Sequence, residues 1–148
     1  MSAEAIAIPR LKLDEGFRAA AYPDPITHAE PITIGYGATF HDLKLGTVWT
    51  EPQAAADLIK RVAGFAEQLD DQLAWWRTIG PVRAAVLLNM AYNLGIHGLL
   101  GFSGTLAAVK ALQFELASLK MLQSAWARQV GGRALRLSNQ MRTGVLSV

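Results

Sequence analysis

Hydrophobic positions divide the chain into a turn-rich first part and a largely helical second part. Residues 51–73 carry an apolar stripe with three- and four-residue spacing, which predicts one long helix. Thr50 precedes it as an N-cap, with Pro52 in the first turn and Gln53 at the capping-box position. Residues 17–48 instead hold short β-branched runs between Gly and Pro residues. We expect short strands there, near residues 19–22, 32–36 and 47–48.

Glycine and proline also mark the helices that follow. Pro81 opens an apolar helix that Gly95 closes. The elements expected after it are a turn over residues 98–104, one or two helices over residues 105–129 and a short helix over residues 133–141. At the other end, residues 3–15 predict a helix interrupted at Pro9. The pattern therefore predicts an α+β fold that is mostly α, in a single domain of 148 residues.

Acidic and basic residues are distributed unequally between the two halves of the chain. Residues 1–71 contain 6 Lys and Arg against 11 Asp and Glu, whereas residues 72–148 contain 8 against 1. The basic half favours an anionic partner, such as cell-wall polymer or a membrane surface, although a solvated basic surface gives the same pattern. No nucleic-acid recognition motif is present, so we expect no nucleic-acid partner.

Composition excludes several kinds of chemistry. The chain has no Cys, so it holds no disulfide or thiolate metal site, and its three His residues are scattered. We expect neither a metal nor a cofactor. The segment before Pro9 lacks the basic and long apolar regions of a signal peptide, which predicts a cytoplasmic start. Residues 84–109 carry no charge, but their Asn and Gly residues favour two buried helices over a membrane span.

Two carboxylates near the N-terminus are candidates for acid–base chemistry. Glu15 precedes Gly16 at the expected helix end, and its apolar neighbours Leu11 and Phe17 would favour a protonated general acid. Asp24 lies between two prolines and is expected to be more solvated and ionised. Two carboxyl groups in contrasting environments can divide the work of cleaving a glycosidic bond. In the strand segment that follows, Thr33 offers a hydroxyl for positioning a water molecule.

These residues resemble a known family. The Asp-Glu-Gly step, the spacing from Glu15 to Asp24 and the TIGYG run with Thr33 are similar to the catalytic region of phage-type lysozymes, the endolysins of glycoside hydrolase family 24. The resemblance continues through residues 81–106 and a closing pattern of arginines, which is Arg133, Arg136 and Arg142-Thr143-Gly144. It implies a lysozyme-like two-lobed fold with a β-hairpin lobe at about residues 17–50, a helical lobe at about residues 1–16 and 70–148, and a long helix joining them.

The resemblance also implies roles for single residues. Glu15 would be the general acid, Asp24 would assist the attacking water or the developing cation, and Thr33 would position the water. Arg133 would face Glu15. Four further residues are candidates for lining or flanking the substrate cleft: Tyr36, Asn93, Phe102 and Ser103. The sequence leaves open whether the sugar product inverts or retains its configuration, and the resemblance favours inversion.

The sequence departs from the family at two places. The spacing from Asp24 to Thr33 is longer than in the short members, so residues 27–30 look like an insertion in the hairpin turn. Ala38 stands where the family usually has His after the GYG run. We expect this change to affect the internal bonding of the small lobe more than the chemistry.

The leading hypothesis is a monomeric muramidase that hydrolyses the bond from N-acetylmuramic acid to N-acetylglucosamine in bacterial peptidoglycan. Such an endolysin would remain in the host cytoplasm until another protein opens the membrane, then act on the wall; attachment to a virion is the alternative. Two other functions stay open. One is a lytic transglycosylase, which needs a single catalytic acid. The other is a non-catalytic, cationic protein that disrupts the wall or makes transient contact with anionic membranes.

Overall fold

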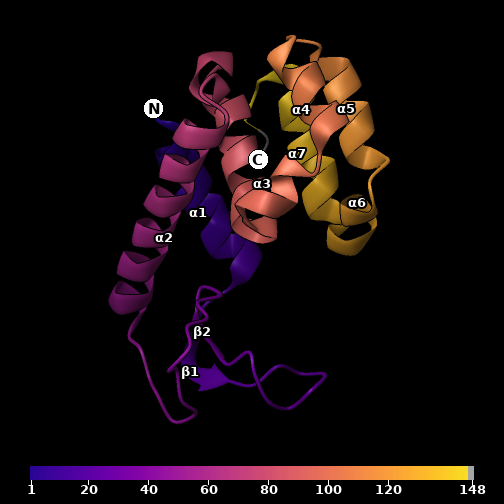
Figure 1. The fold of residues 1–148 in the computed structure, drawn as a ribbon. Coiled ribbons are helices and arrows are strands. Elements are labelled where there is room, and N and C mark those ends of the chain that lie inside the picture. Colours follow the sequence, from indigo (N-terminus) through magenta and orange to yellow (C-terminus); the bar gives the residue numbers. More distant parts are fainter. Residues whose placement is uncertain (147–148) are drawn as a thin grey trace. The chain divides into compact units, whose positions relative to one another are not determined.

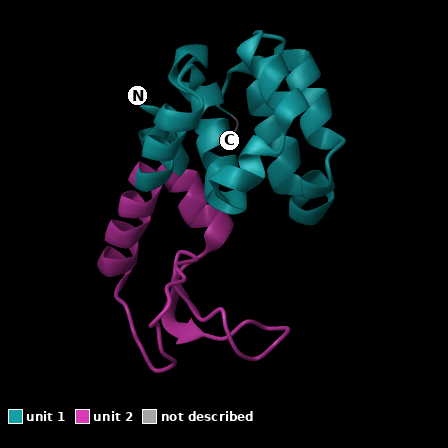
Figure 2. Ribbon diagram, viewed as in Figure 1, with its two compact units in different colours: residues 1–7, 64–148 teal, residues 8–63 magenta. Residues whose placement is uncertain are grey.

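Helices make up most of the computed structural model, which describes residues 1–146 (Figure 1). Ser147 and Val148, the last residues of the expected domain, lie outside the described residues. A two-stranded antiparallel sheet accompanies the helices, which confirms the predicted α+β, mostly α class. The chain divides into two compact units, one formed by residues 1–7 and 64–148 and the other by residues 8–63 (Figure 2).

The sheet lies in the second unit, which we call the hairpin unit (residues 8–63). Strand β1 (Arg18–Tyr22) pairs with β2 (Thr33–Gly35), with Arg18 opposite Gly35 and Tyr22 opposite Thr33. Four steps along β1 therefore match two along β2, so β1 is bulged. Val48 forms an isolated bridge with β1, as the pattern near residues 47–48 predicts.

A small apolar core holds this sheet together. Ile34, Ala38 and Leu43 are buried, and Ile32 and Trp49 pack against them. The backbones of Ile34 and Ala38 exchange two hydrogen bonds, at 3.0 Å and 2.8 Å. Ala38 thus adds its methyl group to the core, and the turn after β2 is closed by main-chain bonds.

Helix α1 (Ala3–Glu15) runs without a break through Pro9, so the expected interruption is wrong. Proline in a helix removes one hydrogen bond and crowds the preceding turn. Ala3, Ala7 and Leu11 are buried at four-residue spacing on both sides of Pro9. Burial along this stripe supplies the tertiary packing that local propensity lacks.

Helix α2 (Glu51–Gln72) begins where the sequence indicates. The backbone amide of Thr50 donates to Gln53 Oε1 at 2.8 Å, and the backbone amide of Gln53 donates to Thr50 Oγ1 at 3.3 Å. This reciprocal pair is the predicted capping box. The first part of α2 belongs to the hairpin unit and the rest to the other unit.

Helix α3 (Pro81–Leu100) provides the core of the other unit, which we call the helical unit (residues 1–7 and 64–148). Its residues from Ala84 to Ala91 are all buried. Gly95 breaks the helical path with φ 76° and ψ 161°, values that a residue with a side chain rarely adopts. The helix resumes to Leu100, so the turn expected over residues 98–104 is shorter than predicted.

Four helices complete this unit, and α5 packs against α4 and α7. The segment expected to hold one or two helices holds three, because Leu112 adopts φ 61° and Ser124 caps a new helix through its hydroxyl. A 3₁₀ helix, η1, precedes α3. The bounds are η1 (Trp76–Ile79), α4 (Ser103–Lys110), α5 (Phe114–Leu122), α6 (Ala125–Val130) and α7 (Gly132–Thr143).

Within residues 1–146, no single helix has the length and apolarity to cross a membrane. Helices α3 and α4 meet both criteria only when taken together, and they are bent by 104°. In α4, Leu106, Ala108 and Val109 are buried, which agrees with the two buried helices expected here.

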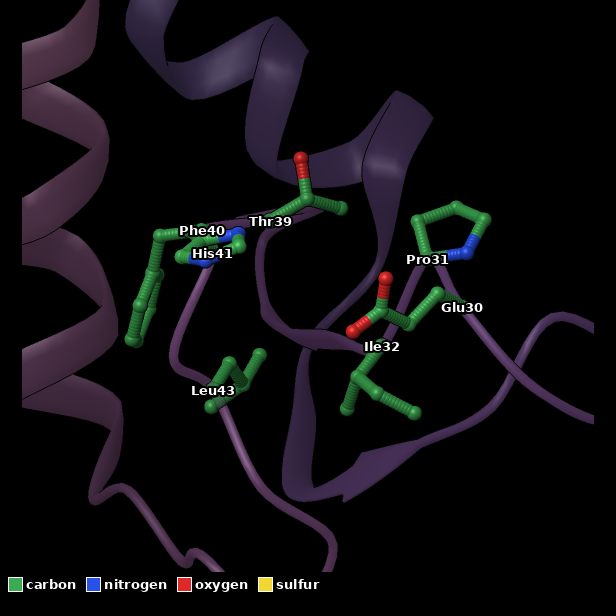
Figure 3. A pocket seen from close by; sticks show the side chains of 7 residues that line it. All are labelled: Glu30, Pro31, Ile32, Thr39, Phe40, His41 and Leu43. Carbon is green, nitrogen blue, oxygen red and sulfur yellow. The ribbon is translucent and has the colours of Figure 1, made fainter.

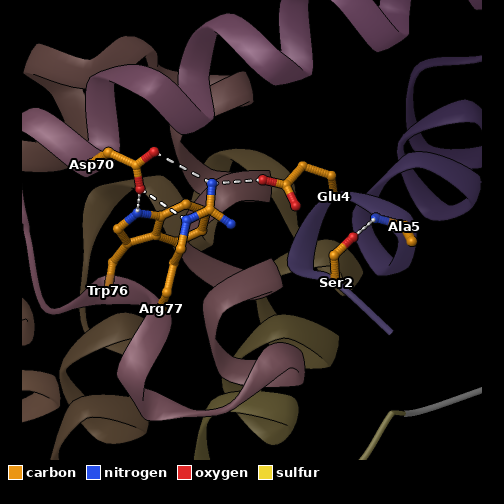
Figure 4. A network of polar contacts seen from close by, with 6 residues as sticks. All are labelled: Ser2, Glu4, Ala5, Asp70, Trp76 and Arg77. Carbon is orange, nitrogen blue, oxygen red and sulfur yellow. Dashed lines mark hydrogen bonds and ion pairs between the residues drawn. The ribbon is translucent and has the colours of Figure 1, made fainter.

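An ionic network joins three segments of the helical unit (Figure 4). Arg77 donates to Asp70 Oδ1 at 2.9 Å and to Glu4 Oε1 at 2.8 Å. The indole of Trp76, which is fully buried, donates to the same Asp70 oxygen at 2.7 Å. Asp70 therefore satisfies a buried indole nitrogen as well as pairing with a surface cation.

Candidate active site

Glu15 is the last residue of α1, and its side chain is half-buried in the hairpin unit. Its carboxylate lies against Gly37, because a Cβ atom on Gly37 would stand 3.1 Å from Glu15 Oε2. Gly37 has φ 81°, so this position favours glycine for its backbone as well as for space. The GYG run thus brings main chain against the carboxyl group that the sequence selects as the acid.

Tyr36 is 5% exposed and is held by polar contacts inside the same unit. Its hydroxyl donates to Glu51 Oε1 at 2.9 Å, and Lys12 donates to the same oxygen at 3.2 Å. Burial, and then the Glu51 acceptor, raise the pKa of Tyr36, while the bonds from Tyr36 and Lys12 lower the pKa of Glu51. The Tyr36 ring also packs beside Phe17, with 5.7 Å between centroids. The expected role of Tyr36 in binding substrate stays a prediction.

Asp24 follows β1 and closes a tight turn with its side chain. Its Oδ1 accepts from the backbone amides of Ile26 at 2.8 Å and Thr27 at 2.9 Å. These bonds, that of Thr27 first, lower the pKa of Asp24, as expected for a carboxylate that accepts two amides. The direction agrees with the ionised state predicted for Asp24.

The suspected insertion at residues 27–30 folds back onto Asp24. The backbone amide of Asp24 donates to the carbonyl of Ala29 at 2.9 Å, and that of His28 donates to the carbonyl of Asp24 at 2.8 Å. Thr27 Oγ1 donates to the carbonyl of Glu30 at 3.2 Å. Residues 27–30 therefore form a bonded turn that holds the backbone of Asp24.

Thr33 begins β2 and lies opposite Tyr22, two residues before Asp24. The strand pairing therefore brings Thr33 to the end of the hairpin from which Asp24 projects. Glu15, Asp24 and Thr33 all belong to the hairpin unit. The three expected catalytic residues come from the end of α1, the turn after β1 and the start of β2.

A surface pocket of about 250 Å³ adjoins the start of β2 (Figure 3). Its walls come from the segment before Thr33 and from the segment after Ala38. Leu43 is buried, whereas Phe40 is exposed and stacks on Trp49 with 6.0 Å between centroids. The lining residues are Glu30, Pro31, Ile32, Thr39, Phe40, His41 and Leu43.

Three of the expected supporting residues meet around Trp126 in the helical unit. Trp126 Nε1 donates to Asn93 Oδ1 at 2.8 Å, and the rings of Phe102 and Trp126 lie edge to face at 6.0 Å. Phe102, Ser103 and Trp126 line a hollow of about 450 Å³ that Lys120 also borders. The sequence pattern did not single out Trp126 or Lys120, because their neighbours at this hollow come from separate helices.

Arg133 donates from Nε to Asn89 Oδ1 at 3.0 Å. Asn89 is 2% exposed, so the bond satisfies a buried amide on α3 and ties it to α7. This explains the one polar residue in the buried stretch from Ala84 to Ala91. Arg133 and Glu15 belong to different units, and their expected contact stays a prediction.

The described part of the chain shows no cluster of metal-ligating side chains. Among residues 1–146, no group of three or more His, Asp or Glu side chains is placed to hold a metal ion.

The sequence also matches a known protein family. The family model described as "Phage lysozyme" matches residues 12–142, a span that contains Glu15, Asp24, Thr33 and the arginines of α7 up to Arg142. The chain belongs to the phage lysozyme family. Membership confirms the family resemblance of the sequence, and the matched residues include parts of both units.

One curated relative is a phage protein that is longer than this chain. The pre-baseplate central spike protein Gp5 of Enterobacteria phage T4 is 34% identical over 71 residues. The matched stretch covers 48% of this chain and 12% of that relative. The chain thus spans about an eighth of the length of this relative.

Proposed function

We propose that this phage lysozyme is a muramidase that hydrolyses the β-1,4 bond between N-acetylmuramic acid and N-acetylglucosamine in bacterial peptidoglycan. The observation that carries the proposal is the contrast between two carboxyl groups of the hairpin unit. Glu15 is half-buried against Gly37, whereas Asp24 is held as a carboxylate by two backbone amides. Family membership supports the same class of reaction.

The roles follow from these environments. Glu15, as a carboxylic acid, gives its proton to the glycosidic oxygen, so the leaving sugar departs with a free hydroxyl. Thr33 positions a water molecule, and Asp24 accepts one of its protons as the water oxygen bonds to the anomeric carbon. A water activated on the face opposite the leaving group inverts the configuration of that carbon. A proton returned from Asp24 to Glu15 through solvent restores the starting state.

The basic segment gives a reason for attraction to the wall. Residues 72–148 carry seven more Lys and Arg than Asp and Glu, and peptidoglycan bears carboxylates on its peptides. In this proposal the protein works as a phage endolysin at the cell wall after another protein has opened the membrane. A single chain supplies all the proposed catalytic residues, so a monomer suffices.

Product analysis tests the reaction directly. Purified Gram-negative sacculi are digested with the protein, and the released muropeptides are measured by mass spectrometry and reducing-end assay. Hydrolysis predicts reducing muramic acid ends, each carrying the mass of one added water. Products with only 1,6-anhydro ends would show a lytic transglycosylase instead, and an absence of new glycan ends would refute both.

A further inference from the structure

Arg61 reaches from α2 to the turn that follows β2. Its Nη2 donates to the carbonyl of Tyr36 at 3.1 Å, and its Nη1 donates to the carbonyl of Gly37 at 3.5 Å. On its other side, Nε donates to Asp57 Oδ2 at 2.8 Å. Asp57 lies one helical turn before Arg61, so it fixes the guanidinium from within α2.

The turn that Arg61 holds is the one that covers Glu15. Gly37 is near enough to the Glu15 carboxylate that an added Cβ would stand 3.1 Å from Oε2. The same turn has a second attachment through the Tyr36 hydroxyl, which donates to Glu51. Arg61 binds main-chain carbonyls of the turn, whereas Glu51 binds the side-chain hydroxyl of Tyr36.

We propose that Arg61 is a positioning residue for Glu15, acting through the main chain of Tyr36 and Gly37. This inference rests on the proposed role of Glu15 as the catalytic acid. A guanidinium presents several N–H groups in a rigid fork, so it can hold two carbonyls and a carboxylate together. A lysine, with a single ammonium, can replace only part of that arrangement.

By holding this turn, Arg61 would determine what lies against one side of the Glu15 carboxyl group. While Arg61 holds the turn, Gly37 keeps water from that side and fixes where the carboxyl group stands. Release of the turn would let Gly37 move, which changes both the placement and the solvation of the acid. Both changes should act on the chemical step more than on substrate affinity, because the bonds of Arg61 that hold the turn are made to the protein itself.

The test compares Arg61→Gln and Arg61→Lys with Lys60→Gln, an exposed neighbour on α2. On soluble glycan fragments, Arg61→Gln should lower kcat by about tenfold or more and leave KM within about twofold. The limb of the pH profile that Glu15 controls should shift, and Arg61→Lys should recover part of the loss. Lys60→Gln should match the wild type in all three readouts.

A readout independent of activity removes the ambiguity of a folding defect. The Glu15 side-chain carboxyl carbon is titrated by NMR in the wild type, in Arg61→Lys and in Asp57→Asn, which loosens the guanidinium without removing it. Altered Glu15 titration in these variants supports the inference. An unaltered titration, or a kcat loss explained by the folded fraction alone, overturns it. If Glu15→Gln stays active, the proposed function fails; if Glu15→Gln is inactive and Arg61→Gln is normal, only this inference fails.

Discussion

Glu15 and Gly37 are in close contact: Oε2 of the glutamate would be 3.1 Å from a Cβ built on the glycine. A contact this short leaves no room for a side chain at position 37 unless the carboxyl group moves. Gly37 also has φ 81°, which adds a backbone reason for glycine. Gly37, at the end of the GYG run, therefore leaves space for the Glu15 carboxyl group and also allows the backbone to turn after β2.

Replacement of Gly37 by alanine should reduce activity more than stability. The methyl group would displace the Glu15 carboxyl group, and the positive φ should cost about 1–2 kcal/mol of folding free energy. Gly46→Ala is the matched control, because Gly46 has φ 94° in the same unit with nothing within 4 Å of an added Cβ. Thermal unfolding should shift similarly in both variants, while wall hydrolysis falls only in Gly37→Ala. Equal wall hydrolysis by Gly37→Ala and Gly46→Ala would show that the space beside the Glu15 carboxyl group does not matter for activity.

Asp24→Asn should separate charge from structure in the hairpin turn. Asparagine keeps an oxygen that can accept from Ile26 and Thr27, so the turn should persist, but the negative charge is lost. We expect hydrolysis to fall by at least about a hundredfold with little change in unfolding temperature. Asp42→Asn, an exposed acid in the same unit, should stay near wild type. An active Asp24→Asn variant would remove Asp24 from the mechanism.

The lowered pKa of Asp24 predicts how this residue should behave as the pH falls. Because the two amides lower the pKa of Asp24, its carboxylate stays ionised to a lower pH than an ordinary aspartate, whose pKa is about 3.9. Loss of activity as the pH falls from neutral to about 4 should therefore not come from protonation of Asp24. The check is an NMR titration of the Asp24 carboxyl carbon, and a midpoint above that of a model aspartate would contradict this.

The Asp70–Arg77–Glu4 network should contribute stability that disappears in acid. Hydrogen bonds from Arg77 and Trp76 lower the pKa of Asp70. For Glu4, burial is the largest influence and raises the pKa, but hydrogen bonds, that from Arg77 foremost, outweigh it, so the pKa of Glu4 is lowered as well. A carboxylate with a lowered pKa in the folded state stabilises the protein above its unfolded pKa, and this contribution is lost as pH falls through the lowered value. Stability should therefore drop below about pH 4.

Two variants at Asp70 test this network. Asp70→Asn keeps an acceptor for the buried Trp76 indole and should show a weaker acid dependence than the wild type. Asp70→Leu leaves that nitrogen without its acceptor and should cost about 1–3 kcal/mol at neutral pH. Urea unfolding from pH 3 to pH 7 measures both effects. If the unfolding free energy of wild type and of Asp70→Asn falls in parallel as the pH is lowered, the Asp70 carboxylate is not the source of the acid-sensitive stability.

Local signals predicted much of the fold. The Thr50–Gln53 capping box fixed the start of α2, and Pro81 and Gly95 marked the opening and the break of α3. These features act over a few residues, so they are visible in sequence. Pro9 misled the prediction because buried positions along α1 outweigh its local penalty.

The candidate site was predictable only in part. Glu15, Asp24 and Thr33 were chosen because their spacing and the TIGYG run resemble the catalytic region of phage-type lysozymes. A carboxyl or hydroxyl group near a turn is by itself common and does not indicate catalysis. Glu51 and Arg61 were missed because each looks like an ordinary charged residue on a helix surface. Their contacts with Tyr36 and Gly37 depend on how α2 packs on the hairpin, which no short-range pattern records.

The most direct measurement is the clearing of outer-membrane-permeabilised Gram-negative cells by wild type, Glu15→Gln and Glu67→Gln. Circular dichroism confirms the fold of each, and Glu67 is an exposed acid on α2 that serves as the control. Loss of a general acid predicts that Glu15→Gln clears the suspension at least about a hundredfold more slowly, while Glu67→Gln matches the wild type. Clearing by folded Glu15→Gln at a rate near wild type would contradict the assignment of Glu15 as the catalytic acid.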